Sequence, residues 1–123
     1  MGGIDIVINN AGIMSGPVEF PETPIAAMMK VIDVNLIAMM LGTRLAVELM
    51  HARGIAGVVI NTASVAGLSG GGGPQAYSAA KAAVINLTTS TAIELAPYSI
   101  RVNAICPGII FTPLMHRGAE DEA

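Results

Sequence analysis

Short runs of β-branched and other apolar residues alternate along the chain with two long segments in which apolar and polar residues mix. The short runs lie at residues 4–8, 57–61 and 100–105, and each stops at a polar or glycine-containing turn. Runs of this length and composition are typical of strands that are buried on both faces of a parallel sheet. The pattern therefore predicts three buried strands.

The two longer segments predict helices over residues 24–52 and 75–96. Thr23 followed by Pro24 is a start signal for the first helix, and Pro97 ends the second. The predicted order is strand, helix, strand, helix, strand. Because each crossover is long enough for a helix, we expect parallel strands with right-handed connections, which is an α/β fold.

The ends of the predicted strands gather most of the polar, glycine and proline residues. These ends fall at residues 9–12, 61–67 and 106–112. In an open parallel sheet, ligands bind beyond the carboxyl ends of the strands. The sequence therefore predicts a binding site at this edge of the sheet.

Composition excludes several classes of protein. Hydrophobic residues make up 53% of the chain and charged residues 12%, which is too apolar for a disordered protein. The net charge is −3 with no cluster of basic residues, so we expect no nucleic-acid surface. Cys106 is the only cysteine and no Cys/His pair has metal-ligand spacing, so we expect neither a disulfide nor a metal site.

The apolar stretch from residue 25 to residue 50 is interrupted by charged and polar side chains. A membrane-spanning helix needs about 18 or more nearly continuous apolar residues, so we expect none. The first residues also lack a basic leader followed by a short apolar segment, which favours the cytoplasm. The excess of Ala, Met, Ile and Val predicts that part of the apolar surface is covered by another subunit or another segment.

Tyr77 and Lys81 carry the strongest local chemical signal. Residues at positions i and i+4 share one face of a helix. An ammonium group beside a phenol favours the phenolate form, and such a phenol can give or take a proton near neutral pH. On its own, however, the Tyr-x-x-x-Lys spacing is equally that of an ordinary helix pair.

Two further polar residues stand in informative places. Ser64 lies just past a strand end, where its hydroxyl could bond the oxygen of an alcohol or carbonyl. Asn35 lies in the middle of a predicted helix among apolar neighbours, although asparagine is a mediocre helix former. Asn35 is either an amide with partners in the packing or an exposed position.

In order, the motifs Asn9-Asn10-Ala11-Gly12, Asn35, Asn61-x-x-Ser64-x-x-Gly67, Tyr77-x-x-x-Lys81 and Pro107-Gly108 resemble those of short-chain dehydrogenases/reductases. The resemblance covers essentially all 123 residues. It implies one partial NAD(P)-binding domain over residues 1–123, part of a Rossmann-like, doubly wound parallel sheet.

The resemblance also implies a reaction, hydride transfer between NAD or NADP and a secondary alcohol or ketone. Tyr77 would be the general acid/base, and Lys81 would favour its phenolate form and bond the nicotinamide ribose. Ser64 would orient the substrate oxygen. Asn35 would hold a water that links Lys81 to solvent. The implied cofactor contacts are Asn9, Ala11, Gly12, Tyr77, Lys81, Pro107, Gly108, Ile110 and Thr112.

The family's glycine-rich cofactor turn, and the residue that selects NAD or NADP, would lie upstream of Ile4 and are not in this sequence. We therefore expect a catalytic half that is truncated and inactive alone, with an open edge at its first strand. Residues 71–76 fit the pattern G-x-G-x-x-A. They come several residues after the strand end, however, and are interpreted as a flexible rim between Ser64 and Tyr77.

Two alternatives stay open. The chain could be a non-catalytic interaction module, because its two long helices are apolar on several faces. The resemblance implies a homo-oligomer, a dimer or tetramer, through residues 24–52 and 75–96. A family member with altered chemistry, a dehydratase or epimerase, is the second alternative, which the intact Ser64, Tyr77 and Lys81 disfavour.

Overall fold

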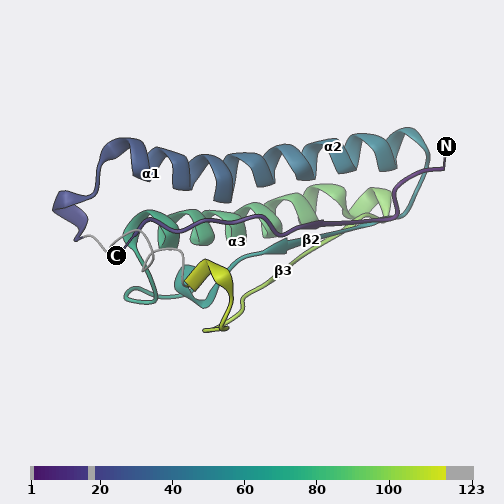
Figure 1. Cartoon of the computed structure of the whole chain (residues 1–123). Coiled ribbons are helices and arrows are strands. Elements are labelled where there is room, and N and C mark those ends of the chain that lie inside the picture. Colours follow the sequence, from purple (N-terminus) through teal and green to yellow (C-terminus); the bar gives the residue numbers. More distant parts are fainter. Residues whose placement is uncertain (1, 17–18, 116–123) are drawn as a thin grey trace.

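The computed structural model describes residues 2–16 and 19–115 and contains a parallel sheet of three strands (Figure 1). The strands are β1 (Ile6–Asn9), β2 (Val58–Thr62) and β3 (Arg101–Ile105), in the order β1-β2-β3. Ile6 pairs with Val58, which pairs in turn with Arg101. The predicted α/β fold with parallel strands is confirmed.

The first strand begins two residues later than its predicted start at Ile4 and ends one residue later, at Asn9. Pairing explains the shift, because the neighbouring strand β2 begins at Val58, opposite Ile6. β2 and β3 each begin one residue later than predicted, by the same criterion. These shifts of one or two residues leave the predicted binding edge in place.

The helix predicted over residues 24–52 is divided into three parts. It consists of α1 (Ile25–Ile32), the π-helical turn η2 (Asp33–Ile37) and α2 (Ala38–Ala52). Within the turn, the N–H of Ala38 donates to the carbonyl oxygen of Asp33, five residues back instead of four. The prediction of one regular α-helix was wrong at this turn.

The helix start also differs in detail. Thr23 was predicted to cap the first helix, but its hydroxyl donates to the carbonyl oxygen of Glu19 at 3.0 Å. That bond belongs to the short 3₁₀ turn η1 (Phe20–Glu22), which precedes α1. Pro24 takes the position before the first helical residue, and its fixed backbone angle suits that place.

The second helix, α3 (Gln75–Leu95), matches its predicted start and ends one residue early. A 3₁₀ turn, η4 (Ala96–Tyr98), follows and carries Pro97. A third short turn, η3 (Val65–Gly67), comes directly after β2. The long helix α3 therefore begins near the carboxyl ends of the strands and runs back along the sheet (Figure 1).

Both long helices pack on one face of the sheet. Alternate strand residues such as Val59 and Val102 point toward the helices and join a buried core with Met50, Leu95 and Ile100. The opposite face has no helix over it among the described residues, and Ile6 and Ile8 are each 61% exposed there. β1 is also an edge strand of the described sheet. Its outer edge is apolar and open to pairing with another strand.

By length and composition, the helical stretch Ile25–Ala52 is apolar enough to cross a membrane, the one such stretch among the described residues. The charged and polar residues in this stretch therefore do not lower its mean hydropathy enough to exclude a membrane-spanning helix. Asn35, one of these residues, and the nearby Thr43 are buried in contacts with the rest of the domain. These contacts place the helix as a layer that packs on the sheet.

Candidate active site

Lys81 lies at the centre of the carboxyl-terminal edge of the sheet. Its side chain is only 3% exposed, and its ammonium group donates a 2.8 Å hydrogen bond to the backbone carbonyl oxygen of Thr62, the last residue of β2. Burial lowers the pKa of Lys81 because the charged form loses hydration. The fold thus holds a cation at the predicted site.

Tyr77 lies one helical turn before Lys81 on α3, and the two side chains share a face as predicted. The Lys81 Nζ atom is 5.6 Å from the centroid of the Tyr77 ring. The ring is 9% exposed and packs against Val31 and Ala66. The structure therefore joins this pair in one buried site at the start of α3.

Ser64 follows β2 on an extended backbone and caps the turn η3. Its Oγ atom accepts a 3.1 Å hydrogen bond from the N–H of Ala66. Ala66 in turn packs against Tyr77, so the turn that Ser64 caps rests on the tyrosine. The hydroxyl hydrogen of Ser64 is not used in the capping bond, which leaves it to donate to a substrate oxygen.

Glycine permits the close approach of η3 to α3. A Cβ atom at Gly67 would lie 2.6 Å from the backbone carbonyl carbon of Lys81 and 2.7 Å from the backbone nitrogen of Ala82. No side chain fits there, so the turn rests directly on the helix backbone. Gly73 likewise brings the loop before α3 against the Tyr77 ring, where a Cβ atom would lie 3.3 Å from the ring edge.

Asn35 is a fully buried amide with partners on two segments. Its Nδ2 atom donates to the carbonyl oxygens of Ile13 at 2.7 Å and of Val31 at 2.8 Å. Its Oδ1 atom accepts from the N–H of Ile13 at 3.1 Å. Of the two interpretations left open by the sequence, the satisfied packing amide is the one found.

Gly12 lies between Asn35 and Lys81. A Cβ atom at this position would be 2.9 Å from the Asn35 Oδ1 atom and 3.6 Å from the Lys81 Nζ atom. The segment after β1 therefore approaches the Asn35 amide this closely only because residue 12 has no side chain. Three of the predicted site residues, Gly12, Asn35 and Lys81, thus gather around one point.

Asn9 was expected to lie against a cofactor ribose, but its side chain points toward the helices. Its Nδ2 atom donates to the Thr43 Oγ1 atom at 3.1 Å and to the Asn61 Oδ1 atom at 2.9 Å. Its Oδ1 atom faces Gly42, where there is no room for a side chain. The side-chain nitrogen is thus used within the fold. A contact between Asn9 and the ribose stays a prediction, and other atoms of Asn9 would have to form it.

The segment after β3 joins the same edge. Val65 N–H donates to the carbonyl oxygen of Pro107 at 3.1 Å, which ties this segment beside Ser64. Beyond it, Ile110 is 57% exposed and Phe111 is 87% exposed. Of the predicted cofactor contacts on this segment, Pro107 is thus tied to the turn after Ser64, and Gly108, Ile110 and Thr112 follow it along the chain. Ala11 lies exposed on the segment after β1.

Sequence reasoning missed two parts of this arrangement. The Thr62 carbonyl that binds Lys81 is a backbone atom, so no residue type signals it. A hydrogen-bonded set of polar side chains, formed by the half-buried Asn9 and the buried Thr43, Asn61 and Thr88, was also missed. Its signal was present, because Thr43 and Thr88 are polar residues on the sheet-facing sides of otherwise apolar helices.

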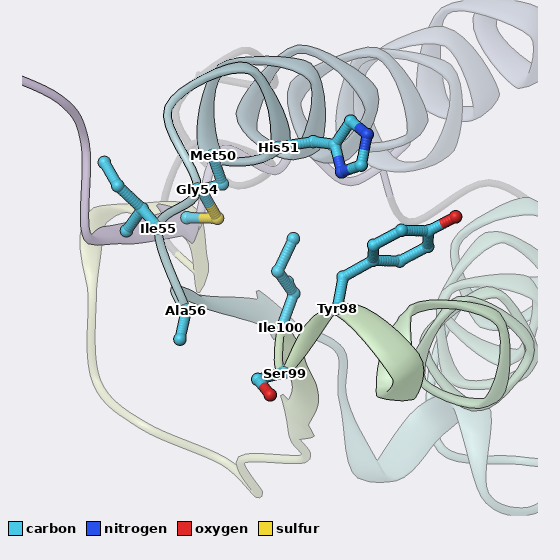
Figure 2. Close-up of a pocket in the computed structure, with 8 residues that line it drawn as sticks. All are labelled: Met50, His51, Gly54, Ile55, Ala56, Tyr98, Ser99 and Ile100. Carbon is cyan, nitrogen blue, oxygen red and sulfur yellow. The ribbon is translucent and has the colours of Figure 1, made fainter.

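A separate pocket of about 350 Å³ lies at the opposite, amino-terminal end of the strands (Figure 2). Met50 and Ile100 form its apolar floor, and the rings of His51 and Tyr98 meet edge to face at its side, with centroids 4.7 Å apart. None of the predicted site residues lines it. It lies far from the carboxyl ends of the strands and is therefore separate from the Lys81 site.

The described residues fit a nicotinamide dinucleotide in two respects. The Lys81 ammonium has three N–H groups, of which one is bonded to Thr62, so others remain for ribose hydroxyls. The bare Cα atom of Gly12 leaves open the space that a side chain would fill next to that ammonium. The donor set at the edge is thus suited to a polyhydroxylated ligand beside a small alcohol.

Comparison with known proteins identifies the family. The model of the short chain dehydrogenase family matches residues 1–123. The chain is 47% identical over 107 residues to 3beta-hydroxysteroid dehydrogenase 2 of Eggerthella lenta, covering 87% of this chain and 41% of that protein. It is 41% identical over 121 residues to 3-alpha-(or 20-beta)-hydroxysteroid dehydrogenase of Mycobacterium bovis, covering 98% and 45%.

Solved structures agree. Levodione reductase superposes with a TM-score of 0.88 at 38% identity, over 98% of this chain and 46% of that one. 4-Hydroxyisoleucine dehydrogenase, complexed with NADH and succinate, superposes with a TM-score of 0.85 at 40% identity, over 89% and 47%. The chain spans about half the length of the curated relatives it matches. With its motifs, its parallel Rossmann-like sheet and its sequence in agreement, the chain belongs to the short-chain dehydrogenase family.

Proposed function

We propose that this chain carries the proton-handling half of an NAD(P)-dependent oxidoreductase that interconverts a secondary alcohol and a ketone. One observation carries the proposal: the Lys81 ammonium is buried at the strand end, 5.6 Å from the centre of the Tyr77 ring, and the turn that Ser64 caps rests on the same helix. The relatives' names, hydroxysteroid dehydrogenases and a levodione reductase, support the same reaction class.

A nicotinamide dinucleotide, when bound, supplies the hydride acceptor or donor of this chemistry. Lys81 would bond the ribose hydroxyls with the N–H groups not used by Thr62. Pro107, Gly108, Ile110 and Thr112 would line the nicotinamide, with Ala11 and Gly12 on the opposite segment. A related solved structure that contains NADH supports the class of cofactor.

Proton transfer would be the task of Tyr77. In the oxidation direction, its phenolate oxygen takes the proton of the alcohol O–H, and in reduction its hydroxyl returns a proton to the same oxygen. Lys81 would place its positive charge beside this phenol, with its Nζ atom 5.6 Å from the ring centroid. Ser64 donates its hydroxyl hydrogen to the substrate oxygen and so stabilises the negative charge that develops there.

Asn35 would act mainly by holding the site together. Both hydrogens of its side-chain amide are used on Ile13 and Val31. The proposed water that links Lys81 to solvent would therefore be held by the backbone carbonyl of Asn35. The π-helical turn around this residue supports that role, because it changes the regular pairing of the helix backbone at this point.

We further propose that these 123 residues on their own do not sustain turnover. None of them supplies the glycine-rich phosphate turn, and β1 presents an apolar open edge. Titration of NADH with the chain, followed by cofactor fluorescence, is expected to show no saturable binding. Measured turnover of a ketone with NADH or NADPH by the isolated chain would contradict this part of the proposal.

A second function, assembly without chemistry, is favoured by a row of exposed apolar residues on the first helical stretch. The row recurs every four residues on either side of the π-helical turn and consists of Ile25, Met29, Ile37, Leu41, Leu45 and Leu49, each at least 44% exposed. Such a stripe suits the interface of a homodimer or tetramer. Two measurements distinguish the functions: sedimentation analysis of the chain, and a turnover assay after a nucleotide-binding half has been supplied. Self-association without turnover favours assembly alone.

The substrate would be a hydrophobic, medium-sized alcohol or ketone. Ile109, Ile110 and Phe111 are exposed beside the site, and two of the relatives are named for hydroxysteroids. We also propose that the protein is cytoplasmic.

The experiment that tests the proposed reaction is to fuse the nucleotide-binding half of levodione reductase to this chain. NADH absorbance is then followed with 3-hydroxysteroids and with smaller secondary alcohols. Saturable, alcohol-dependent NADH formation supports the proposal, and the absence of NADH formation contradicts it.

A further inference from the structure

A line of side-chain hydrogen bonds crosses the buried layer between the sheet and the two long helices. Asn9 Nδ2 donates to Asn61 Oδ1 at 2.9 Å, and Asn61 Nδ2 donates to Thr88 Oγ1 at 3.1 Å. Thr88 Oγ1 in turn donates to the carbonyl oxygen of Val84 at 2.8 Å. The line connects β1, β2 and α3 through polar atoms in an otherwise apolar layer.

The direction of each bond in this line is fixed. The single hydroxyl hydrogen of Thr88 is used on Val84, so its oxygen must accept from Asn61. The nitrogen of the Asn61 amide therefore faces α3 and its oxygen faces Asn9. Asn61 is fully buried and Thr88 is 6% exposed, so the loss of either partner leaves a polar atom without water to replace it.

This line lies next to the Lys81 contact on both elements. Asn61 and Thr62 are consecutive residues of β2. Thr88 and Lys81 lie about two turns apart on the same face of α3. The helix is thus tied to the same short stretch of strand at two points, by a side-chain bond at Thr88 and by the ammonium of Lys81.

The two ties differ in stiffness. The Thr88 hydroxyl is attached directly to Cβ and its rotamers are restricted, so its bond to Asn61 fixes how far α3 can slide along β2. The Lys81 ammonium sits on a flexible four-carbon stem, so the position of the helix backbone limits which atoms it can reach. The stiff tie therefore determines whether the flexible one reaches the Thr62 carbonyl.

We propose that Thr88 is a positioning residue for Lys81: its hydrogen bond to Asn61 sets the position of α3 along β2 and so holds the ammonium on the Thr62 carbonyl. Its value for catalysis rests on the proposed function. The positioning itself is a property of the fold and can be measured without cofactor or substrate.

The chain offers a matched control one residue away. The Thr89 hydroxyl also donates to a backbone carbonyl four residues earlier, that of Ile85 at 3.2 Å, but it is exposed and has no bond to the strand among the described residues. Thr88→Val and Thr89→Val each remove a hydroxyl bond to the backbone carbonyl four residues earlier. Only Thr88→Val also removes the hydrogen bond to Asn61. Thr88→Ser keeps the hydroxyl.

The readout is the exchange of lysine ammonium hydrogens with water, measured by NMR on the ¹⁵N-lysine-labelled chain. The sequence has two lysines, and the exposed Lys30 serves as an internal reference. We expect exchange at Lys81 to become severalfold faster in Thr88→Val. It should stay at the wild-type rate in Thr88→Ser and Thr89→Val, and Lys30 should not change in any variant.

An unchanged Lys81 exchange rate in folded Thr88→Val, or an equal increase in Thr89→Val, would overturn the proposal. If Thr88→Val does not fold, Thr88→Ala makes the same test, because it removes the hydroxyl without setting a methyl group against the Asn61 amide. A protein that shows the expected exchange pattern but no turnover with a supplied nucleotide half would refute the proposed function and leave the positioning role standing.

Discussion

The Lys81 ammonium and the Thr62 carbonyl oxygen are 2.8 Å apart, which joins the start of the long helix α3 to the end of the central strand β2. A cation that is 3% exposed loses most of its hydration, and one backbone oxygen replaces only part of it. The arrangement is therefore costly for the charged form of Lys81. The same contact holds the charge 5.6 Å from the centre of the Tyr77 ring.

Replacing Lys81 with methionine should change how stability depends on pH. Burial lowers the pKa of Lys81 below its ordinary value of 10.5, so folding favours the neutral amine. Wild-type stability should consequently rise as pH increases from the lowered pKa to 10.5, and fall as pH drops through that window. Lys81→Met has no such group, so the free energy of unfolding of wild type relative to Lys81→Met should increase across this range. Urea unfolding at a series of pH values measures it, and a pH-independent difference would refute the burial argument.

Asn35→Ala should destabilise the chain by about 2–4 kcal/mol, since three hydrogen bonds in a buried place are each worth about 0.5–1.5 kcal/mol net. The matched control is Asn86→Ala on the exposed side of α3, which should change stability by about 0.5 kcal/mol or less. Chemical denaturation followed by circular dichroism compares the two. Equal, small effects would show that the Asn35 amide does not hold the segment at Ile13 to the helix.

Gly67→Ala should separate Ser64 from the Tyr77 and Lys81 pair. The added methyl group would lie 2.6 Å from the backbone of Lys81, which forces η3 away from α3 at a cost of about 1–3 kcal/mol. Gly70→Ala, in the following loop, meets nothing within 4 Å and should be nearly neutral. A thermal unfolding comparison suffices, and a Gly67→Ala variant as stable as Gly70→Ala would mean that the turn does not rest on the helix.

Much of the arrangement could be predicted from the sequence. Apolar runs and proline or glycine signals locate the three strands and the start of α3, because buried parallel strands have a distinctive composition. The spacing of Tyr77 and Lys81 predicts a shared helix face, which the structure confirms. Ser64 follows a strand, so its place at the carboxyl edge could also be anticipated.

The remaining features depend on contacts between distant segments. The π-helical turn at Asp33–Ile37 adds a residue to one turn, and the composition of these five residues does not mark it. The orientation of Asn9 toward Thr43 is set by α2, which lies far away in sequence. The Thr62 carbonyl is a backbone atom, and any residue type there would present it.

The central claim is that Tyr77 transfers the proton in an NAD(P)-dependent oxidation of a secondary alcohol. The measurement that tests it most directly is the pH dependence of kcat/KM for Tyr77→Phe and for the unmodified sequence, each fused to the nucleotide-binding half of levodione reductase. Phenylalanine keeps the ring that packs against Val31 and Ala66, so the fold should be unchanged. We predict a loss of about 10²- to 10⁴-fold in kcat/KM, the usual contribution of a general acid/base. Turnover by Tyr77→Phe at the rate of the unmodified fusion would contradict the account.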